Sequence, residues 1–457
     1  MRCCHHLSIF VNYAIGLEPL AGLVFNWQRI TKLIGGVDLW QDKVSYRRGK
    51  NKVIMLTAVI RGVEGFPVAA LKIITIKAMS KIIDNTKNRY RENIERLLVG
   101  TDIAFNGDNP WDIRVYNSDL YQRILTQGSL GLGEAYMDEW WDCHQLDELF
   151  NKICQAQLEN KVVVDPQTVM NRILGCVVNR QSLRHAPELI KWHYDIGNDL
   201  YSRMLDKRLT YSCGYWKDAK SLDEAQEHKF DLICRKLNLQ AGQKILDIGC
   251  GWGSFMKFAV ERYRVSCVGV TLSREQVALG KELCQDMPIE IRLMDYRELH
   301  ENFDHIVSIG MFEHVGFKNY GEYMRVANRC LKDGGLFLLH TIGSSKSRIT
   351  VDAWMGKYIF PDSMLPSIKQ IGKAAEGQFV IEDVHNFGAD YDKTLMCWFD
   401  NFSKNWQAII ENYDHRFFLM WKYYLLSCAG AFRARDNQLW QIVLSKNGVP
   451  GGYTSVR

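Results

Sequence analysis

The sequence predicts an α/β fold built on a doubly wound parallel sheet, with a small, mostly helical domain in front of it. The first observation is the stretch Lys244–Phe255, which has the pattern of a short buried strand, an acidic residue and three glycines spaced two apart before a helix. Glycine is needed where a chain turns with positive φ or where a ligand lies against bare backbone. The second observation is that strands and helices alternate from Lys244 onward, which is typical of a parallel sheet with crossover helices.

Length and composition describe an ordinary soluble protein with room for two or three domains. The chain has 457 residues, of which 47% are hydrophobic and 24% are charged. Its 13 cysteines are odd in number and scattered, without any C-x-x-C pair. We therefore expect neither a disulfide framework nor a metal site, and a cytoplasmic location in a reducing compartment.

The positive net charge is confined to the N-terminal extension, residues 1–78. This extension carries 11 Lys/Arg against 4 Asp/Glu, whereas the other 379 residues carry 46 against 48. Because the body of the protein is nearly neutral, the charge gives no case for nucleic acid as a partner. Leu7–Phe25 is mostly apolar, but Glu18 and Pro19 make it a poor membrane span, and a signal-peptide layout is missing. Two interpretations stay open: a membrane-surface anchor, or a poorly packed segment that results from start-site choice.

The rest of the chain divides into a small domain at residues 79–157, a polar connection at 158–186 and a larger domain at 187–457. Three stretches of the small domain have recognisable patterns: a helix, a strand with a turn, and a glycine turn before an aromatic-rich helix. In chain order these are Arg89–Val99, Ile103–Asp108 and Gly128–Trp141.

Five strands are predicted for the sheet of the larger domain. They are Lys244–Ile248, Val265–Val270, Ile289–Met294, His305–Ile309 and Leu336–Thr341. The helix after the second strand begins at Ser273, with Gln276 three residues later, which predicts a capping box. Two late aromatic helices, Leu395–Tyr413 and Arg416–Ser427, precede a final strand at Gln438–Leu444.

The glycine turn differs from the dinucleotide-binding fingerprint. That fingerprint requires a third small residue at position 254 and an acidic residue about 20 residues on. Ser254 is only a partial match, and the second strand ends in Val270-Thr271 without an acidic residue. The pattern Asp-x-Gly-x-Gly-x-Gly instead resembles the first motif of S-adenosylmethionine-dependent methyltransferases. That resemblance implies a Rossmann-like methyltransferase sheet whose glycine turn holds the amino-acid and ribose end of the cofactor through bare amides.

The other cofactor contacts follow from the ends of the next two strands. The superfamily usually offers an acidic residue to the ribose hydroxyls after strand two, and here Gln276 is the better polar candidate. After strand three, Asp295 would accept a hydrogen bond from the adenine amino group and Tyr296 would stack on the ring. The candidate cofactor-binding residues are Tyr211, Ser212, Asp247, Gly249, Cys250, Gly251, Gly253, Thr271, Ser273, Gln276, Asp295, Tyr296 and Arg297.

Several motifs in a common order give a closer resemblance. They are Tyr211–Trp216, Asp247–Gly253, Gly269–Gln276, Met311–Gly316, His340–Gly343, Asn386–Tyr391 and Gly430–Asp436. Together they resemble the family of bacterial cyclopropane-fatty-acyl-phospholipid synthases. The resemblance covers about Met79 to Ser445, and Gly128–Trp141 is similar to the family's small N-terminal, lipid-associated domain.

The resemblance implies a reaction in which the sulfonium methyl of S-adenosylmethionine adds to the cis double bond of an unsaturated phospholipid chain. The resulting carbocation loses a proton from the added methyl and closes to a cyclopropane ring. An isolated alkene is a weak nucleophile, so the site must orient it, exclude water and stabilise positive charge. Aromatic faces can stabilise that charge by about 0.5–2 kcal/mol per well-placed ring.

The resemblance also implies that bound bicarbonate is the base. The residues that match its binding site are Cys213, Glu313, His340, Ile342 and Tyr391. Glu313 would accept from the bicarbonate hydroxyl, while the other groups donate, Ile342 through its backbone amide. Cys428 matches a family cysteine near the active site, and a direct role for it is the weaker expectation.

Each of these residues also has a simpler structural interpretation. Cys213 has the character of a small buried apolar residue, and His340 of a core histidine whose hydrogen bonds are satisfied. Glu313 would then be a carboxylate favoured by the dipole at the start of a helix, and Tyr391 a packing residue.

The lipid substrate implies a membrane surface as a partner. Trp354–Pro361 combines aromatic and basic residues suited to an interface, and core packing is the alternative. We expect a protein that lies peripherally on the inner face of the cytoplasmic membrane, and the family likeness implies a possible homodimer. Two other functions stay open: a lipid C-methyltransferase that does not close the ring, and a lipid-binding module without turnover.

Overall fold

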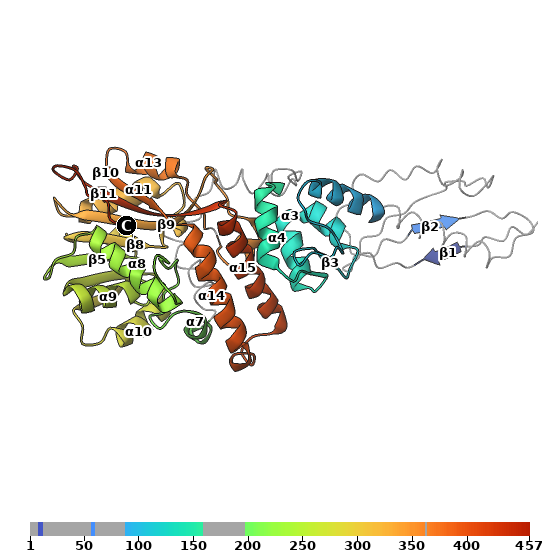
Figure 1. Ribbon diagram of the computed structural model, residues 1–457, viewed down its shortest axis with the longest axis horizontal. Helices are drawn as coiled ribbons and strands as arrows, with labels where there is room; N and C mark the ends of the chain where they lie inside the picture. Colours follow the sequence, from blue (N-terminus) through green and yellow to red (C-terminus); the bar gives the residue numbers. More distant parts are fainter. Residues whose placement is uncertain (1–7, 12–55, 60–86, 159–196, 362) are drawn as a thin grey trace, which may run out of the picture. The chain divides into compact units, whose positions relative to one another are not determined.

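The computed structural model describes residues 8–11, 56–59, 87–158, 197–361 and 363–457. The chain forms two compact units, Met1–Arg89 and Tyr90–Arg457. The first contains a two-stranded antiparallel sheet of β1 (Ser8–Val11) and β2 (Leu56–Val59). The second contains all the elements discussed below (Figure 1). Most of the predicted extension and nearly all of the predicted 158–186 connection lie outside the described residues, so the three domain boundaries stay predictions.

A seven-stranded sheet organises the second unit. In spatial order its strands are β10 (Val380–Asn386), β11 (Asn437–Ser445), β9 (Leu336–Ser344), β8 (His305–Ile309), β5 (Lys244–Ile248), β6 (Ser266–Thr271) and β7 (Ile289–Leu293). The strands from β9 to β7 are parallel, and β11 runs antiparallel between β9 and β10. Since β6 lies on one side of β5 and β8 on the other, the strand order reverses at β5. Ligands of doubly wound sheets bind at such a reversal.

The α/β fold is confirmed, and all six strands predicted for the larger domain are present. The bounds of β5 and β8 agree with the prediction, and β9 continues three residues further, to Ser344. The prediction missed β10, an edge strand in which Val380, Ile381 and Val384 are exposed. Because neither face of this strand is fully buried, its sequence lacks the apolar run that marked the others.

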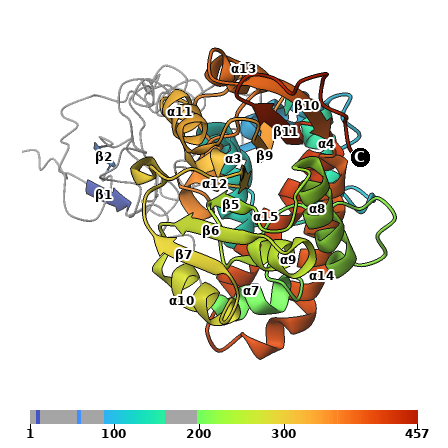
Figure 2. The same ribbon diagram turned by 90° about the vertical axis from the view of Figure 1, so that its left-hand side faces the viewer.

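Helices cover both faces of the sheet because successive side chains of a buried strand point to opposite faces. On one face, Ile245 and Val307 pack with α8 (Leu222–Lys236) and α9 (Ser254–Tyr263). On the other face, Leu246 packs with α11 (Tyr320–Cys330) and α13 (Ile368–Ala375). Figure 2 shows the two pairs of helices on opposite sides of the sheet.

A third, aromatic-rich core joins the N-terminal part of this unit to its late helices. There α4 (Leu146–Gln155) and α3 (Leu120–Met137) pack on α15 (His415–Arg433), which pairs in turn with α14 (Ala389–Asn405). Helix α3 also contacts α12 (Ala353–Tyr358). Both late helices were predicted, although α14 begins earlier than expected and ends at Asn405, before the 3₁₀ turn η4 (Trp406–Ala408).

The N-terminal part corrects two local predictions. Residues 90–98 are helical as predicted, but Ile103–Asp108 forms only an isolated bridge between Phe105 and Ile113. Gly128, with φ 58° and ψ −133°, kinks α3 instead of preceding it, and Trp141 lies beyond the helix in β4 (Trp141–Asp142), which pairs with β3 (Arg114–Val115). Glycine tolerates this positive φ, so the helix resumes after the kink.

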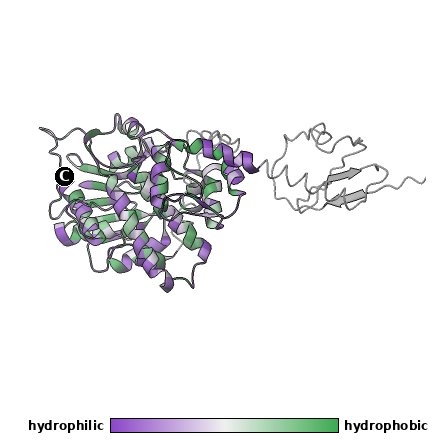
Figure 3. Cartoon of the chain, turned by 45° about the vertical axis from the view of Figure 1, so that its right-hand side comes forward, coloured by the Kyte–Doolittle hydropathy of each residue, from purple (hydrophilic) through white to green (hydrophobic). Residues whose placement is uncertain are grey.

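Polar and apolar residues are mixed along the described helices (Figure 3). None of the helices in the described part of the chain combines the length and the apolar character that crossing a bilayer requires.

Close contact between α15 and α4 generates the first prediction. A Cβ on Gly430 would lie 2.3 Å from the Asp147 carbonyl oxygen and 2.7 Å from the Asn151 amide nitrogen. We expect Gly430→Ala to lower the free energy of unfolding by about 1–3 kcal/mol, because the backbone atoms it meets cannot move aside. Urea denaturation followed by circular dichroism measures this change.

Gly372 is the matched control, because it lies inside α13 with open space at its Cβ position. Gly372→Ala should stabilise the protein by about 0.5–1 kcal/mol, through helix propensity alone. Equal effects of the two substitutions would show that the contact between α15 and α4 is looser than described.

Candidate active site

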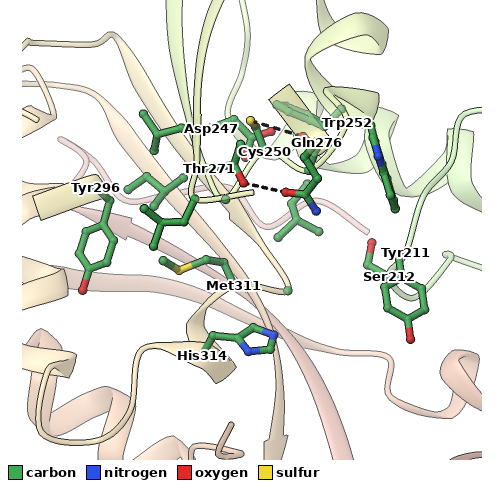
Figure 4. A pocket seen from close by; sticks show the side chains of 18 of the residues that line it. Tyr211, Ser212, Asp247, Cys250, Trp252, Thr271, Gln276, Tyr296, Met311 and His314 are labelled. Atoms are coloured by element: carbon green, nitrogen blue, oxygen red, sulfur yellow. Dashed lines mark hydrogen bonds between the residues drawn. The ribbon is translucent and has the colours of Figure 1, made fainter. Parts of the chain in front are cut away.

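A pocket lies where β5, β6, β7 and β8 end (Figure 4). Its walls come from the segments that follow these strands, together with the loop 209–212. Of the thirteen predicted cofactor-binding residues, those that line the pocket are Tyr211, Ser212, Asp247, Gly249, Cys250, Gly251, Thr271, Gln276, Asp295, Tyr296 and Arg297. Gly253 and Ser273 do not line it. The sequence-based selection therefore converges on one cavity at the point where the strand order reverses.

The turn after β5 has the conformation for which its glycines are required. Gly249, Gly251 and Gly253 have φ of 85°, 56° and 86°. A Cβ on Gly249 would lie 2.6 Å from the Met311 side chain, whereas one on Gly251 would meet nothing within 4 Å. Gly251 therefore presents bare backbone to the pocket, and Gly249 allows the segment after β8 and the turn to approach each other. Gly253 is the N-cap of α9.

Asp247 is the penultimate residue of β5 and carries a buried carboxyl group. Its Oδ1 atom is buried and has no hydrogen-bond partner among the described residues. Burial raises the pKa of Asp247 to about 7, and the positive charge of Lys229 opposes that rise. A buried oxygen of this kind at the pocket wall fits a ligand that carries amino or hydroxyl donors.

The second wall holds Gln276 in a fixed orientation. The Thr271 hydroxyl donates to Gln276 Oε1 at 2.6 Å, so the amide NH₂ of Gln276 is left to donate to a ligand (Figure 4). The predicted capping box is only half formed. Ser273 Oγ accepts from the backbone amide of Gln276, as a capping box requires. The backbone amide of Ser273, however, donates to Thr271 Oγ1 and not to the Gln276 side chain. Ser273 thus serves α10 (Arg274–Leu283) as its N-cap and lies outside the pocket.

At the third wall, Asp295 already has a partner. The Arg297 guanidinium donates to both oxygens of Asp295, from Nε at 2.8 Å and from NH2 at 2.7 Å. An adenine amino group would have to share this carboxylate with Arg297, because each oxygen can accept more than one hydrogen bond. Tyr296 lies beside it in η2 (Tyr296–Glu298), buried and edge-on to Tyr323 with the ring centroids 5.3 Å apart.

Sequence reasoning missed two pocket-side groups. His314 lines the pocket and its ring points into it (Figure 4). Burial lowers the pKa of His314 to about 4, so this imidazole is neutral at pH 7. Lys229, fully buried on α8, donates to Ser212 Oγ at 2.7 Å. His314 directly follows Glu313 in the motif Met311–Gly316, and this position could have identified it. Nothing in the sequence marked Lys229 as buried.

The six predicted catalytic residues do not line this pocket. Glu313 lies in η3 (Phe312–His314), between two pocket-lining residues, Met311 and His314. Its Oε1 accepts from the Ile342 amide at 2.7 Å, and its Oε2 is buried without a partner among the described residues. Burial raises the pKa of Glu313 to about 7. The Ile342 amide, expected to hold an anion, is thus engaged by Glu313.

Cys213, Glu313 and Cys428 each lie within electrostatic reach of Tyr391. Burial first, and then the negative charge that each of Cys213, Tyr211, Glu313 and Cys428 can carry, raises the pKa of the Tyr391 phenol far above its ordinary value. Burial likewise raises the pKa of the Cys213 thiol, which donates to the Gly214 carbonyl oxygen at 3.2 Å, and raises that of Cys428 to about 12. All these hydrogen donors are therefore neutral at pH 7.

His340 lies two residues before Ile342 on β9, so the two side chains point to the same face of the sheet. Its Nδ1 is 3.3 Å from Gln441 Nε2, while its Nε2 is buried without a partner in the described chain. Burial lowers the pKa of His340 well below its usual range, so the ring is neutral. With Gln441 donating to Nδ1, the proton is on Nε2, which becomes a free donor.

Sheet topology and pocket together define the class. A seven-stranded sheet with one antiparallel strand beside its edge, and a positive-φ glycine turn that lines a pocket after β5, is the arrangement of S-adenosylmethionine-dependent methyltransferases. The profile of the mycolic acid cyclopropane synthetase family matches residues 181–442. The chain belongs to this family.

Individual relatives agree with this assignment. The chain is 52% identical over 371 residues to a cyclopropane-fatty-acyl-phospholipid synthase of Escherichia coli K12, covering 81% of this chain and 96% of that one. The structure of the Mycobacterium tuberculosis cyclopropane synthase MmaA2 is similar with a TM-score of 0.54 at 30% identity, covering 57% of this chain and 98% of that one. The mycolic acid cyclopropane synthase CmaA1, solved with SAH and CTAB, gives a TM-score of 0.53 at 32% identity, with the same coverage.

The unpartnered oxygen of Asp247 generates the second prediction. Asp247→Asn should weaken binding of S-adenosylhomocysteine about 10- to 100-fold, because a hydrogen bond between a ligand and a charged group contributes about 1.5–3 kcal/mol. Isothermal titration calorimetry at pH 8 measures the loss. Glu290→Gln, at an exposed position of β7, is the control and should bind as the wild type does.

The pH dependence of the same affinity separates Asp247 from other groups. Since burial raises the pKa of free Asp247 to about 7, the carboxylate that receives the ligand becomes protonated as pH falls from 8 to 6. Wild-type affinity should fall over that interval, while the affinity of Asp247→Asn stays flat. A similar slope in both proteins would contradict the assignment of Asp247 as the ligand-facing acid.

Proposed function

We propose that this protein is an enzyme that transfers a methylene group from S-adenosylmethionine to the cis double bond of an unsaturated phospholipid chain, forming a cyclopropane ring. The observation that carries the proposal is a buried carboxyl group, Glu313, placed between two residues that line the methyltransferase pocket. The likeness to the E. coli synthase over 96% of its length supports the substrate class.

The residues of the pocket fit S-adenosylmethionine, which supplies an electrophilic methyl group when bound. Asp247 would accept from its amino-acid end, Gln276 would donate to the ribose and Tyr296 would lie against the adenine. The loop that carries Tyr211 covers the pocket from the other side. These residues orient the donor and exclude water, which an alkene substrate requires.

A row of aromatic rings runs from Tyr211, which lines the pocket, to Tyr391, which lies within electrostatic reach of Glu313. The Tyr211 and Trp398 rings lie 5.1 Å apart, and Tyr391 meets Trp398 edge-on at 5.9 Å. Their faces can stabilise positive charge on the lipid by about 0.5–2 kcal/mol per ring. Since Tyr391 also lies within electrostatic reach of Glu313, the stabilised cation and the proton acceptor would be close together.

The proposed base is bicarbonate, held behind the pocket. Glu313 Oε2 and His340 Nε2 are buried atoms that need partners, and the neutral phenol of Tyr391 adds a donor. The neutral thiol of Cys213 would have to leave the Gly214 carbonyl oxygen to donate to the anion. Because the Ile342 amide donates to Glu313, it would serve the anion only by sharing its hydrogen or by releasing Glu313. Cys428 lies near Tyr391 and is proposed only to shape the site.

The membrane and oligomer assignments are also proposals. Trp354 is buried against the third core, and Tyr358 donates to Glu134 at 2.8 Å. Core packing therefore accounts for this stretch better than an exposed interface, while Phe360 and Pro361 line the pocket. We propose peripheral contact with the inner face of the cytoplasmic membrane through another surface, and a homodimer. Vesicle flotation and light scattering test these two assignments.

Removing the charge of Glu313 is the third prediction. Glu313→Gln should lower turnover at least about 100-fold, as loss of proton-transfer machinery does, while S-adenosylhomocysteine affinity stays within about threefold. Turnover is measured on monounsaturated phospholipid vesicles by mass spectrometry of the acyl chains. Glu376→Gln, at an exposed helix end, is the control.

The chemical identity of the products tests ring closure, and turnover without bicarbonate in the buffer tests the proposed base. Cyclopropane chains are expected, and methyl-branched or methylenated chains would overturn ring closure in favour of a lipid C-methyltransferase. An absence of any product, together with lipid binding, would favour a module without turnover. Removal of bicarbonate from the buffer should reduce wild-type turnover, and undiminished turnover would contradict the proposed base.

A further inference from the structure

Two polar side chains of α8 are fully buried beside the pocket. Gln226 and Lys229 are three residues apart on this helix and therefore share one face. Lys229 Nζ donates to Gln226 Oε1 and to Ser212 Oγ, both at 2.7 Å. Gln226 Nε2 donates to the Ser212 carbonyl oxygen at 2.8 Å. The pair thus holds Ser212 by its side chain and its backbone at once.

A fully buried lysine without a close carboxylate partner is uncommon. In the described part of the chain, Lys229 forms hydrogen bonds to neutral oxygens and lies 4.5 Å from the Phe230 ring centroid. A buried ammonium group without an ion-pair partner costs free energy, which an apolar residue of similar size would not. Stability alone therefore does not explain a lysine at this position.

The segment that the pair holds carries two parts of the proposed site. Tyr211 and Ser212 line the cofactor pocket, and Cys213 follows them into the cluster around Tyr391. The segment begins at Leu209, whose φ of 58° is unusual for a branched residue. Such a conformation persists only where surrounding contacts enforce it.

Other side chains hold the near end of the loop. Asp206 accepts from the Thr210 amide at 2.8 Å, and Ser254 Oγ donates to the Arg208 carbonyl oxygen at 2.6 Å. At the far end, the Gly214 amide donates to Thr394 Oγ1 at 3.1 Å. Between these anchors, the contacts of Gln226 and Lys229 fix the stretch nearest the reacting groups.

Charge supports the same placement. Burial lowers the pKa of Lys229 to about 7, opposed by Asp206, Cys213 and Asp247. Lys229 in turn lowers the pKa values of Asp247 and Cys213 against the effect of burial. The ammonium group is therefore within electrostatic reach of both the pocket carboxyl and the thiol.

We propose that Gln226 and Lys229 are positioning residues that hold Tyr211–Cys213 against the cofactor pocket, with Lys229 acting through Ser212 and touching no substrate. This inference rests on the proposed function, because it assigns the pocket to S-adenosylmethionine. It adds to that function two residues that do not line the pocket themselves but hold a segment that does. Both lie on α8, which contributes only Phe230 to the pocket wall.

Lys229→Met tests the proposal, and Lys236→Met is the matched control. Lys236 is also fully buried on α8, but its Nζ contacts His385 Nδ1 at 3.1 Å, away from the pocket. Lys229→Met should weaken S-adenosylhomocysteine binding at least about tenfold and raise KM for S-adenosylmethionine more than it lowers kcat. Lys236→Met should change the thermal midpoint but leave S-adenosylhomocysteine affinity within about twofold.

A double variant distinguishes positioning from general packing. If Gln226 and Lys229 hold one segment together, then Gln226→Met combined with Lys229→Met should lose less S-adenosylhomocysteine affinity than the product of the two single losses. Additive losses, or wild-type affinity in folded Lys229→Met, would overturn the proposal. Should Lys229→Met fail to fold, Gln226→Met must show a smaller loss in the same direction. Failure of the wild-type protein to bind S-adenosylhomocysteine would instead overturn the proposed function.

Discussion

Desolvation of a few titratable groups beside the glycine turn is the constraint on which the rest of the structure depends. Asp247 and Glu313 are buried carboxyl groups whose pKa values burial raises to about 7, and His340 is a buried imidazole held neutral. Raised carboxyl pKa values destabilise the fold as pH rises from the unfolded values near 4 through 7. The three cores must outweigh this effect, and in return the site keeps polar atoms that only a ligand can satisfy.

The proposed reaction requires that water be excluded from the site. A carbocation on a lipid chain survives only where water cannot reach it. Neutral hydrogen-bond donors place no positive charge beside it that would repel it. Hydroxyl, thiol and imidazole groups are all neutral at pH 7 here, while aromatic rings supply the facing surface. The same low-polarity surroundings make Lys229 a long-range influence on Asp247, because nearby charges are poorly screened in a buried site.

Much of the fold followed from local sequence patterns, and the misses have physical reasons. Buried parallel strands such as β5 and β8 are short, mostly apolar runs, so they were identified with their bounds. The edge strand β10 exposes apolar residues and carries no such run. Gly128 was predicted to lie in a turn before a helix, but it lies at a kink inside α3. Sequence alone does not distinguish a kinked helix from a helix that ends. For the stretch around Trp354 the sequence left an interface and core packing open, and its tryptophan packs inside.

By itself, the sequence determined six of the seven strands of the sheet, the glycine turn and most of the residues gathered at the carboxyl ends of the strands, because these depend on short-range periodicity and backbone geometry. Tertiary structure alone decided the partners of those residues. The Arg297–Asp295 pair is local, whereas the Ile342 amide on Glu313 and the burial of Lys229 beside Ser212 depend on which segments meet in space. Two of these three contacts join residues at least 17 positions apart, and the energy of a buried hydrogen bond depends on surroundings that no local pattern contains.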